Sequence, residues 1–131
     1  MGAGAVVGIG TDIVSVARIA EALERFGERF AQRVLAPEEI DVFRASRRPA
    51  RLLAKRFAAK EAALKALGTG FSQGLGASQI AVVHDALGKP GLALSGAAQA
   101  RARALGVGES LLTLSDEKDY AVAFVVLLAA A

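Results

Sequence analysis

The segment from Pro49 to Leu67 reads PARLLAKRFAAKEAALKAL, and Gly68 and Gly70 follow it. Alanine, leucine, lysine and arginine dominate this segment, and all four favour the helical state. Proline suits the first position of a helix, and glycine suits the position just past its end. The sequence therefore predicts a long helix over residues 49–67, against which the rest of the chain packs.

The predicted helix is apolar on two opposite sides. On a wheel of about 100° per residue, Lys60 falls inside the stripe of large apolar residues and Glu61 at its edge. A helix of this kind is covered on both sides, so both charged side chains would be partly desolvated. In one interpretation Lys60 extends its ammonium to water and Glu61 pairs with Lys65, and in the other they serve a functional site. The large residues are Leu53, Phe57, Leu64 and Leu67, and the alanines are Ala58, Ala59, Ala62, Ala63 and Ala66.

Short strands and helices are predicted on either side of this helix. Over residues 5–14 apolar residues alternate with small ones, as in a strand, and Asp12 shares a face with two glycines. A helical spacing then runs from Ser15, a predicted N-cap, to Phe30, and a short helix starts at Pro37. Further strands are predicted over residues 79–84, 91–95, 111–114 and 120–128, and a further helix over residues 97–105.

These elements predict the α+β class, with the long buried helix against a largely antiparallel sheet. Hairpin-length gaps separate most strands that follow the helix, which favours an antiparallel meander. A chain of 131 residues has the size of one domain, so we expect a single domain over residues 1–131 with one core.

The composition excludes several classes of protein. The chain has no cysteine and a single histidine, which excludes disulfides, a thiolate nucleophile and Cys- or His-rich zinc sites. Hydrophobic residues make up 53%, too many for a lone small globule to cover, so we expect self-association. The longest apolar run, residues 120–131, is shorter than the roughly 20 residues of a membrane span, and the N-terminus lacks the features of a signal peptide. We therefore expect a cytoplasmic protein without a membrane partner.

The charge balance points to an anionic ligand or partner. Sixteen Lys and Arg residues stand against thirteen Asp and Glu, and the isoelectric point is near 9.7. Asp12 and Glu61 lie on separate predicted elements near basic residues, as suits Mg²⁺ bound by one or two carboxylates and substrate phosphates. Arg56, Lys60 and Lys65 would then hold the phosphates. The alternative for Asp12 is a turn or N-cap role at the end of its strand, and the spacing does not show that the two carboxylates meet.

Other motifs give weaker signals. The glycine-rich residues 68–76 follow a helix and lack Gly-Lys-Ser/Thr, so they are not a Walker-type phosphate loop. The serines lack the His–Asp context of a serine hydrolase. A noncatalytic nucleic-acid-binding module, using residues 25–33 and 44–51, is the runner-up, but its support is charge alone and the few aromatic residues fall at core-like spacings.

Two long motifs carry a resemblance to a known family. Residues 8–13 (GIGTDI) with Arg18 and Ile19 downstream, and residues 56–70 (RFAAKEAALKALGTG), resemble holo-acyl-carrier-protein synthase, the small bacterial type of 4'-phosphopantetheinyl transferase. The likeness continues through Gly88, Lys89 and Pro90 and the strand region at residues 115–126.

The resemblance implies an activity and a set of site residues. The enzyme would move the 4'-phosphopantetheine group of coenzyme A to a serine of apo acyl carrier protein, in a Mg²⁺-dependent phosphoryl transfer that releases adenosine 3',5'-bisphosphate. It implies Asp12 and Glu61 as metal ligands and, with Lys65, as catalytic residues, while the base that accepts the serine proton is left open. The residues implied for coenzyme A are Arg56, Lys60, Leu64, Lys65, Gly68, Lys89 and Pro90.

The resemblance also implies partners. Acyl carrier proteins are acidic and dock on the first helix of the family, so the basic side of that helix would bind them. Members are homotrimers with active sites at subunit interfaces, which agrees with the apolar composition. Many members carry histidine where Asp116 stands, so a mechanism that needs this histidine is in doubt here. The residues implied for carrier binding are Arg18, Arg25, Arg29 and Arg33.

Overall fold

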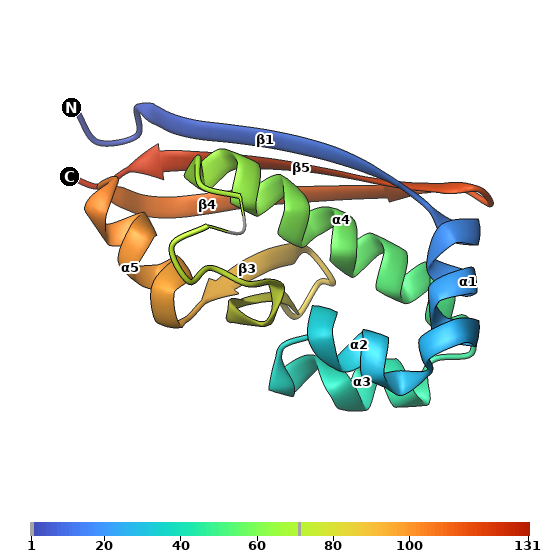
Figure 1. Cartoon of the computed structure of the whole chain (residues 1–131). Helices are drawn as coiled ribbons and strands as arrows, with labels where there is room; N and C mark the ends of the chain where they lie inside the picture. The colour runs from blue at the N-terminus through green and yellow to red at the C-terminus, as the bar shows by residue number, and fades with distance from the viewer. Residues whose placement is uncertain (1, 71) are drawn as a thin grey trace.

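A computed structural model of the chain describes residues 2–70 and 72–131. The long helix α4 lies across one face of a β-sheet, a small hairpin and helix α5 lie on the other side of α4, and α1, α2 and α3 gather at the end of the molecule away from the two termini (Figure 1). In chain order the elements are β1 (Val6–Ser15), α1 (Val16–Phe26), α2 (Glu28–Val34), the 3₁₀ turn η1 (Pro37–Glu39), α3 (Ile40–Ala45), α4 (Pro49–Leu67), the 3₁₀ turn η2 (Ala77–Gln79), β2 (Ile80–His84), β3 (Pro90–Leu94), α5 (Gly96–Ala104), β4 (Val107–Asp116) and β5 (Tyr120–Ala129).

The main sheet is antiparallel, with the strand order β1-β5-β4, so β1 and β4 are its edges. Side chains alternate along β5, and every second one is buried against α4. The opposite face of the sheet carries apolar side chains that none of the described elements covers, among them Ile9, Ile13 and Phe124, which are 60%, 63% and 41% exposed. The sheet is thus packed on one side and bare on the other.

Helix α4 packs on β1 at backbone distance. A Cβ atom at Gly10 would overlap the carbonyl oxygen of Ala62, and one at Gly8 would overlap that of Ala66. The facing positions on the helix are alanines, so small residues on both partners bring the two backbones together. The space beside the glycines of the Asp12 strand is therefore filled by α4.

Several expectations from the sequence are confirmed. Helix α4 spans Pro49–Leu67, as predicted, and it ends at Gly68 in the left-handed conformation with φ 79°. Its side chains are buried on both sides, as the two-sided pattern indicates. Ser15 caps α1 by accepting a hydrogen bond from the N–H of Arg18 over 3.3 Å.

Two expectations are wrong. The predicted helix from Ser15 to Phe30 is two helices, because Gly27 adopts φ 64° and turns the chain between α1 and α2. The strands after α4 do not form one meander, since β2 and β3 make a separate two-stranded sheet and β5 pairs with the N-terminal β1. Hairpin-length gaps identify local pairs but carry no information about pairing between the two ends of a chain.

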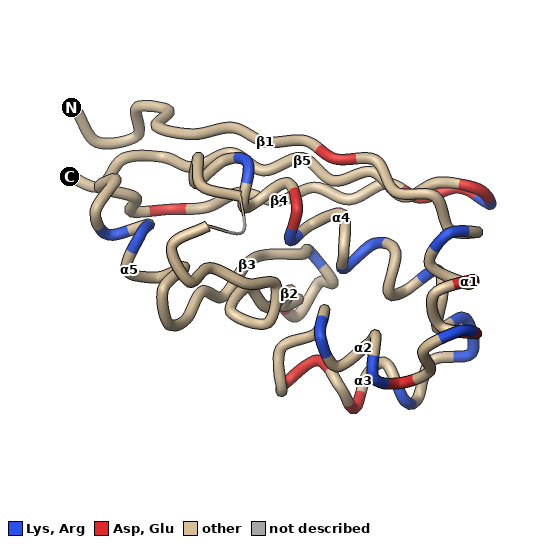
Figure 2. The backbone as a smooth tube through the Cα atoms, viewed as in Figure 1, with Lys and Arg blue, Asp and Glu red and all other residues tan. Residues whose placement is uncertain are grey.

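Charged residues are concentrated at one end of the molecule. Figure 2 shows Lys and Arg along α1 to α3 and along the first half of α4, whereas β1 carries one charged residue, Asp12, and β5 carries none. No helix in the described ranges is both long and apolar enough to cross a bilayer.

The contact between β1 and α4 gives the first prediction. Gly10→Ala should lower the free energy of unfolding by about 3 kcal/mol, because its methyl group meets helix backbone, which cannot rotate away. Gly76→Ala is the matched control, since a Cβ there meets open space and the backbone is extended. Urea unfolding of both variants measures the difference, and equal stability would contradict the close packing.

Candidate functional site

A cleft of about 710 Å³ opens at the free edge of β1, where this strand meets α1 and α4. Asp12 from β1 and Glu61 from α4 both line it, together with Arg18, Phe57 and Tyr120. The two carboxylates, 49 positions apart in the chain, therefore face one space. The close packing of β1 on α4 positions both of them.

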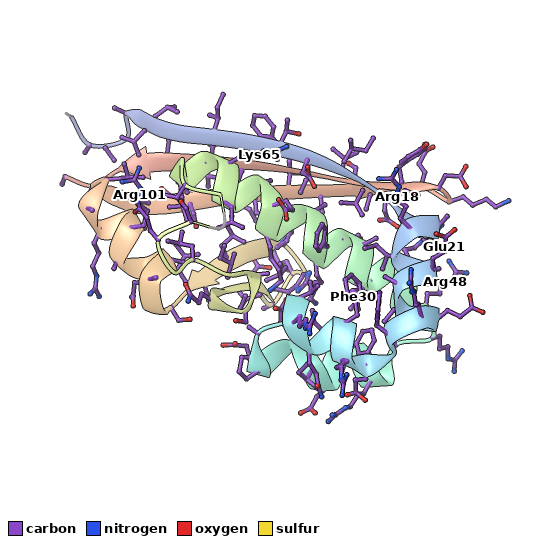
Figure 3. The ribbon with its side chains drawn as sticks, in the orientation of Figure 1. Arg18, Glu21, Phe30, Arg48, Lys65 and Arg101 are labelled. Carbon is purple, nitrogen blue, oxygen red and sulfur yellow. The ribbon has the colours of Figure 1, made fainter. Side chains whose placement is uncertain are left out.

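Asp12 lies inside β1 opposite Ala123 of β5, so its predicted alternative role in a turn or N-cap is wrong. Its side chain is 18% exposed and accepts a hydrogen bond from Lys65 Nζ over 3.1 Å. The same ammonium donates to the carbonyl oxygen of Thr11 over 2.9 Å, so Lys65 bridges α4 and the edge of β1 (Figure 3). In pairing with Asp12, Lys65 departs from its expected partner Glu61.

The environment of Glu61 disfavours its charged form. Burial raises the pKa of Glu61 above its ordinary value of 4.5, the negative charge of Asp12 raises it further, and the Lys65 ammonium opposes both effects. Two like charges that repel across a cleft favour a cation between them. No group of three or more His, Cys, Asp or Glu side chains suited to a metal occurs in the described part of the chain. A cation in this cleft would therefore have two carboxylates, Asp12 and Glu61, as its protein ligands. Mg²⁺ commonly uses one or two carboxylates and leaves its other positions to water and phosphate.

Lys60, one position before Glu61, points into the protein. Its side chain is 1% exposed, so the interpretation in which it extends to water is wrong. The ammonium donates to Glu39 Oε1 over 2.5 Å and to the carbonyl oxygens of Ala77 and Ile80. The geometry therefore gives no support to the predicted contact between Lys60 and phosphate.

Arg56 joins the same buried group from one turn earlier. Its Nη1 atom donates to Glu39 Oε2 over 2.9 Å and to the carbonyl oxygen of Val82 over 3.2 Å. Burial acts to raise the pKa of Glu39, but Lys60, the N–H of Ala36 and Arg56 outweigh it and bring the pKa below 4.5. We call Glu39, Arg56 and Lys60 the buried triad.

The sequence did not single out Glu39, which was visible only as an acidic residue in the first turn of a short helix. The available signal was electrostatic. Lys60 falls inside the buried stripe of the predicted helix, and a buried ammonium needs an anion close to it, which another element can supply.

The remaining residues predicted for coenzyme A lie in three places. Leu64 is buried in the core. Gly68 ends α4, and Arg101 from α5 supports that end by donating from Nε to the carbonyl oxygen of Leu67 over 2.9 Å (Figure 3). Lys89 and Pro90 lie at the β2–β3 hairpin and do not line the cleft that holds the carboxylate pair. This chain alone thus assembles part of the predicted set.

The predicted carrier-binding arginines lie on α1 and α2. Arg18 reaches the cleft, and the guanidinium of Arg25 lies 5.3 Å from the centre of the Phe26 ring. Arg29 and Arg33 line a hollow of about 270 Å³ whose apolar walls are Phe26 and Phe30. Together they form a basic surface with an apolar hollow, which ends at the carboxylate pair.

Asp116, at the end of β4, pairs with the first half of α4. Its carboxylate lies 3.5 Å from Arg51 Nε and 3.8 Å from Lys55 Nζ. In this chain the position is therefore part of an ion-pair cluster.

Comparisons with known proteins give a consistent result. The model of a family described as the 4'-phosphopantetheinyl transferase superfamily matches residues 8–125. The holo-acyl-carrier-protein synthase of Halorhodospira halophila is 61% identical over 123 residues, which are 94% of this chain and 98% of that protein. The crystal structure of holo-acyl-carrier-protein synthase from Neisseria meningitidis superposes with a TM-score of 0.86 at 46% identity, over 93% of this chain and 98% of that one. The enzyme from Helicobacter pylori, solved in complex with coenzyme A, gives 0.79 at 31% identity, over 91% and 98%.

Proposed function

Because this chain belongs to the 4'-phosphopantetheinyl transferase superfamily, we propose that it is a holo-acyl-carrier-protein synthase. It transfers the 4'-phosphopantetheine group of coenzyme A to a serine hydroxyl of apo acyl carrier protein and releases adenosine 3',5'-bisphosphate. The observation that carries this proposal is the carboxylate pair of Asp12 and Glu61, which faces one cleft beside Lys65 in a chain of this family.

Asp12 and Glu61 would hold Mg²⁺. Their fit to this ion rests on two hard oxygen donors, on the repulsion between them, and on an open cleft with room for water and phosphate. When bound, the ion neutralises charge on the pyrophosphate of coenzyme A. The protein contributes the pair already held in place by the packing of α4 on β1.

The cationic side chains orient and neutralise the phosphates. Phosphoryl transfer leaves little covalent work to the enzyme, so positioning and charge neutralisation supply most of the catalysis. Lys65, 55% exposed and fixed by Thr11 and Asp12, presents its ammonium at the edge of the cleft. Arg56 would offer a phosphate the nitrogens of its guanidinium other than Nη1, which donates to Glu39 and to the carbonyl oxygen of Val82. Gly68 leaves the end of α4 open to close approach, because it has no side chain.

The basic surface of α1 and α2 would dock the acidic carrier protein. Arg18, Arg25, Arg29 and Arg33 supply charge complementarity, and the hollow between Phe26 and Phe30 accepts an apolar side chain of the partner. Since Arg18 lines the cleft as well, a carrier bound here has its serine near the carboxylate pair.

The active form would be a homotrimer with its sites at subunit interfaces. The bare face of the β1-β5-β4 sheet supplies the apolar surface that such an assembly buries. The Lys89 and Pro90 of one subunit do not line the cleft of that subunit. In the trimer, a neighbouring subunit would bring its own Lys89 and Pro90 to this cleft. The cytoplasmic location stays a prediction of the sequence.

Loss of either carboxylate tests the metal site. Asp12→Ala and Glu61→Ala should each reduce transfer at least about 100-fold, because each removes a ligand and a charge, while the fold is retained. Mass spectrometry of the carrier protein after incubation with coenzyme A and Mg²⁺ measures transfer, and Mg²⁺ titration calorimetry measures binding. Asp41→Asn, an exposed change on α3 away from the cleft and the sheet, is the control. Near-normal transfer by both alanine variants would refute the assignment.

Charge reversal tests carrier docking. Arg25→Glu should raise the KM for carrier protein about 10-fold or more and leave the KM for coenzyme A unchanged, because a like charge then faces an acidic partner. Steady-state kinetics with each substrate varied in turn measures both constants. Arg103→Glu on α5 provides a control of equal charge change. An equal rise in both KM values would remove the docking role.

The mass of the wild-type protein and of a variant on the bare sheet face tests the proposed trimer. Light scattering should give the wild-type protein three times its chain mass of 13.4 kDa. Phe124→Lys should yield monomers and abolish transfer, since it places a charge at the centre of the apolar face. Leu87→Lys, at a hairpin tip where the leucine is 96% exposed, should remain trimeric. A wild-type monomer with full activity would contradict the proposal.

A further inference from the structure

Glu39 accepts hydrogen bonds from four groups of the protein. It does not line the cleft that holds Asp12 and Glu61. It is 1% exposed and accepts from the N–H groups of Ala36 and Val82 over 2.8 and 3.2 Å, as well as from Arg56 and Lys60. Through these bonds η1, α4 and β2 meet at one carboxylate. Any effect of Glu39 on the cleft must therefore act through the side chains that it binds, Arg56 and Lys60.

Lys60 is fully used by the fold. An ammonium has three protons to donate, and those of Lys60 go to Glu39, Ala77 and Ile80. No proton is left for a ligand, and any contact with coenzyme A would require the side chain to leave the core. Lys60 alone already neutralises Glu39, so Arg56 is not needed for charge balance at this carboxylate.

Arg56 is used only in part. Both hydrogen bonds that it makes to described residues come from Nη1, and its side chain is 8% exposed. Nε and Nη2 of Arg56 make no hydrogen bond to another described residue, and Arg56 as a whole keeps 7% of its surface exposed. The guanidinium is thus anchored at one nitrogen and open at the others.

The buried triad also carries an excess of positive charge. Two cations share one carboxylate, and the surplus lies in a partly desolvated place, where an unbalanced charge is costly. An anion at the open edge of Arg56 would balance it. A guanidinium is planar and rigid, so two acceptors at Nη1 orient the whole group and its remaining donors.

We propose that Glu39 is a positioning residue that holds Arg56 with its open edge toward a phosphate group of coenzyme A, and that Lys60 serves the fold and not the ligand. This inference rests on the proposed function. Holding the guanidinium in one rotamer before the ligand arrives removes an ordering cost from binding. Glu39 therefore acts on affinity for coenzyme A through Arg56.

The test separates affinity from stability. Glu39→Gln keeps the size of the side chain but loses the charge that holds Arg56. Its Kd for adenosine 3',5'-bisphosphate, measured by calorimetry, and its KM for coenzyme A should rise about 10-fold, the effect of one misplaced charge-assisted hydrogen bond. The KM for carrier protein should stay unchanged. Val125→Ala, in the sheet core away from the triad, should lower the melting temperature and leave the Kd as it is.

A second variant covers the case in which Glu39→Gln does not fold. Arg56→Lys keeps the positive charge and a donor for Glu39, but it lacks the rigid fork, so the Kd for the bisphosphate should also rise about 10-fold. An unchanged Kd in the variants that fold overturns the inference. A wild-type protein that binds the bisphosphate but transfers no phosphopantetheine overturns the proposed function instead.

Discussion

The close contact between β1 and α4 is the constraint on which the rest of the structure depends. Glycines at positions 8 and 10 let the strand approach the helix until a methyl group on either would overlap a helix carbonyl. The distance between the two backbones is thus determined by contact between atoms, with no flexible side chain between them. Asp12 is two residues beyond the second glycine, and Glu61 precedes the alanine that this glycine touches. The carboxylate pair is therefore positioned by backbone packing.

Helix α4 carries two sets of charged side chains with different roles. On one side, Glu61 lines the cleft with Asp12, and Lys65 donates a hydrogen bond to Asp12. On another, Arg56 and Lys60 meet Glu39 inside the protein and join the helix to η1 and β2. The buried triad resists sliding of the helix along its axis, because its hydrogen bonds depend on direction as well as distance. The triad and the glycine contact together hold Glu61 opposite Asp12.

The sequence predicted what depends on neighbours in the chain. Helix propensity, Pro49 and Gly68 bound α4 at the observed residues. The break at Gly27 was missed because the apolar spacing runs on through it, although the backbone turns there. The pairing of β1 with β5 joins the two ends of the chain, and no local signal specifies it.

The candidate site divides in the same way. Asp12 and Glu61 were recognisable one by one as carboxylates out of place in apolar elements, but their common cleft needed the strand pairing. The motif suggested a phosphate contact for Lys60, whereas a helical wheel alone places this residue inside the apolar stripe, where the structure finds it. The partner of Lys60 could not be read from the wheel, because Glu39 comes from another element.

Consecutive residues of α4 thus serve different surroundings, since Lys60 is enclosed and Glu61 opens to the cleft. Adding or deleting one residue upstream of them would turn the rest of the helix by about 100° and move both side chains out of their present environments. An insertion or deletion in this part of α4 would therefore disrupt the site, and we expect selection against it. The hairpin tip at Leu87, in contact with little but water, can lengthen or shorten without disturbing the carboxylates. Descendants of this gene should differ there in length and agree in the spacing within α4.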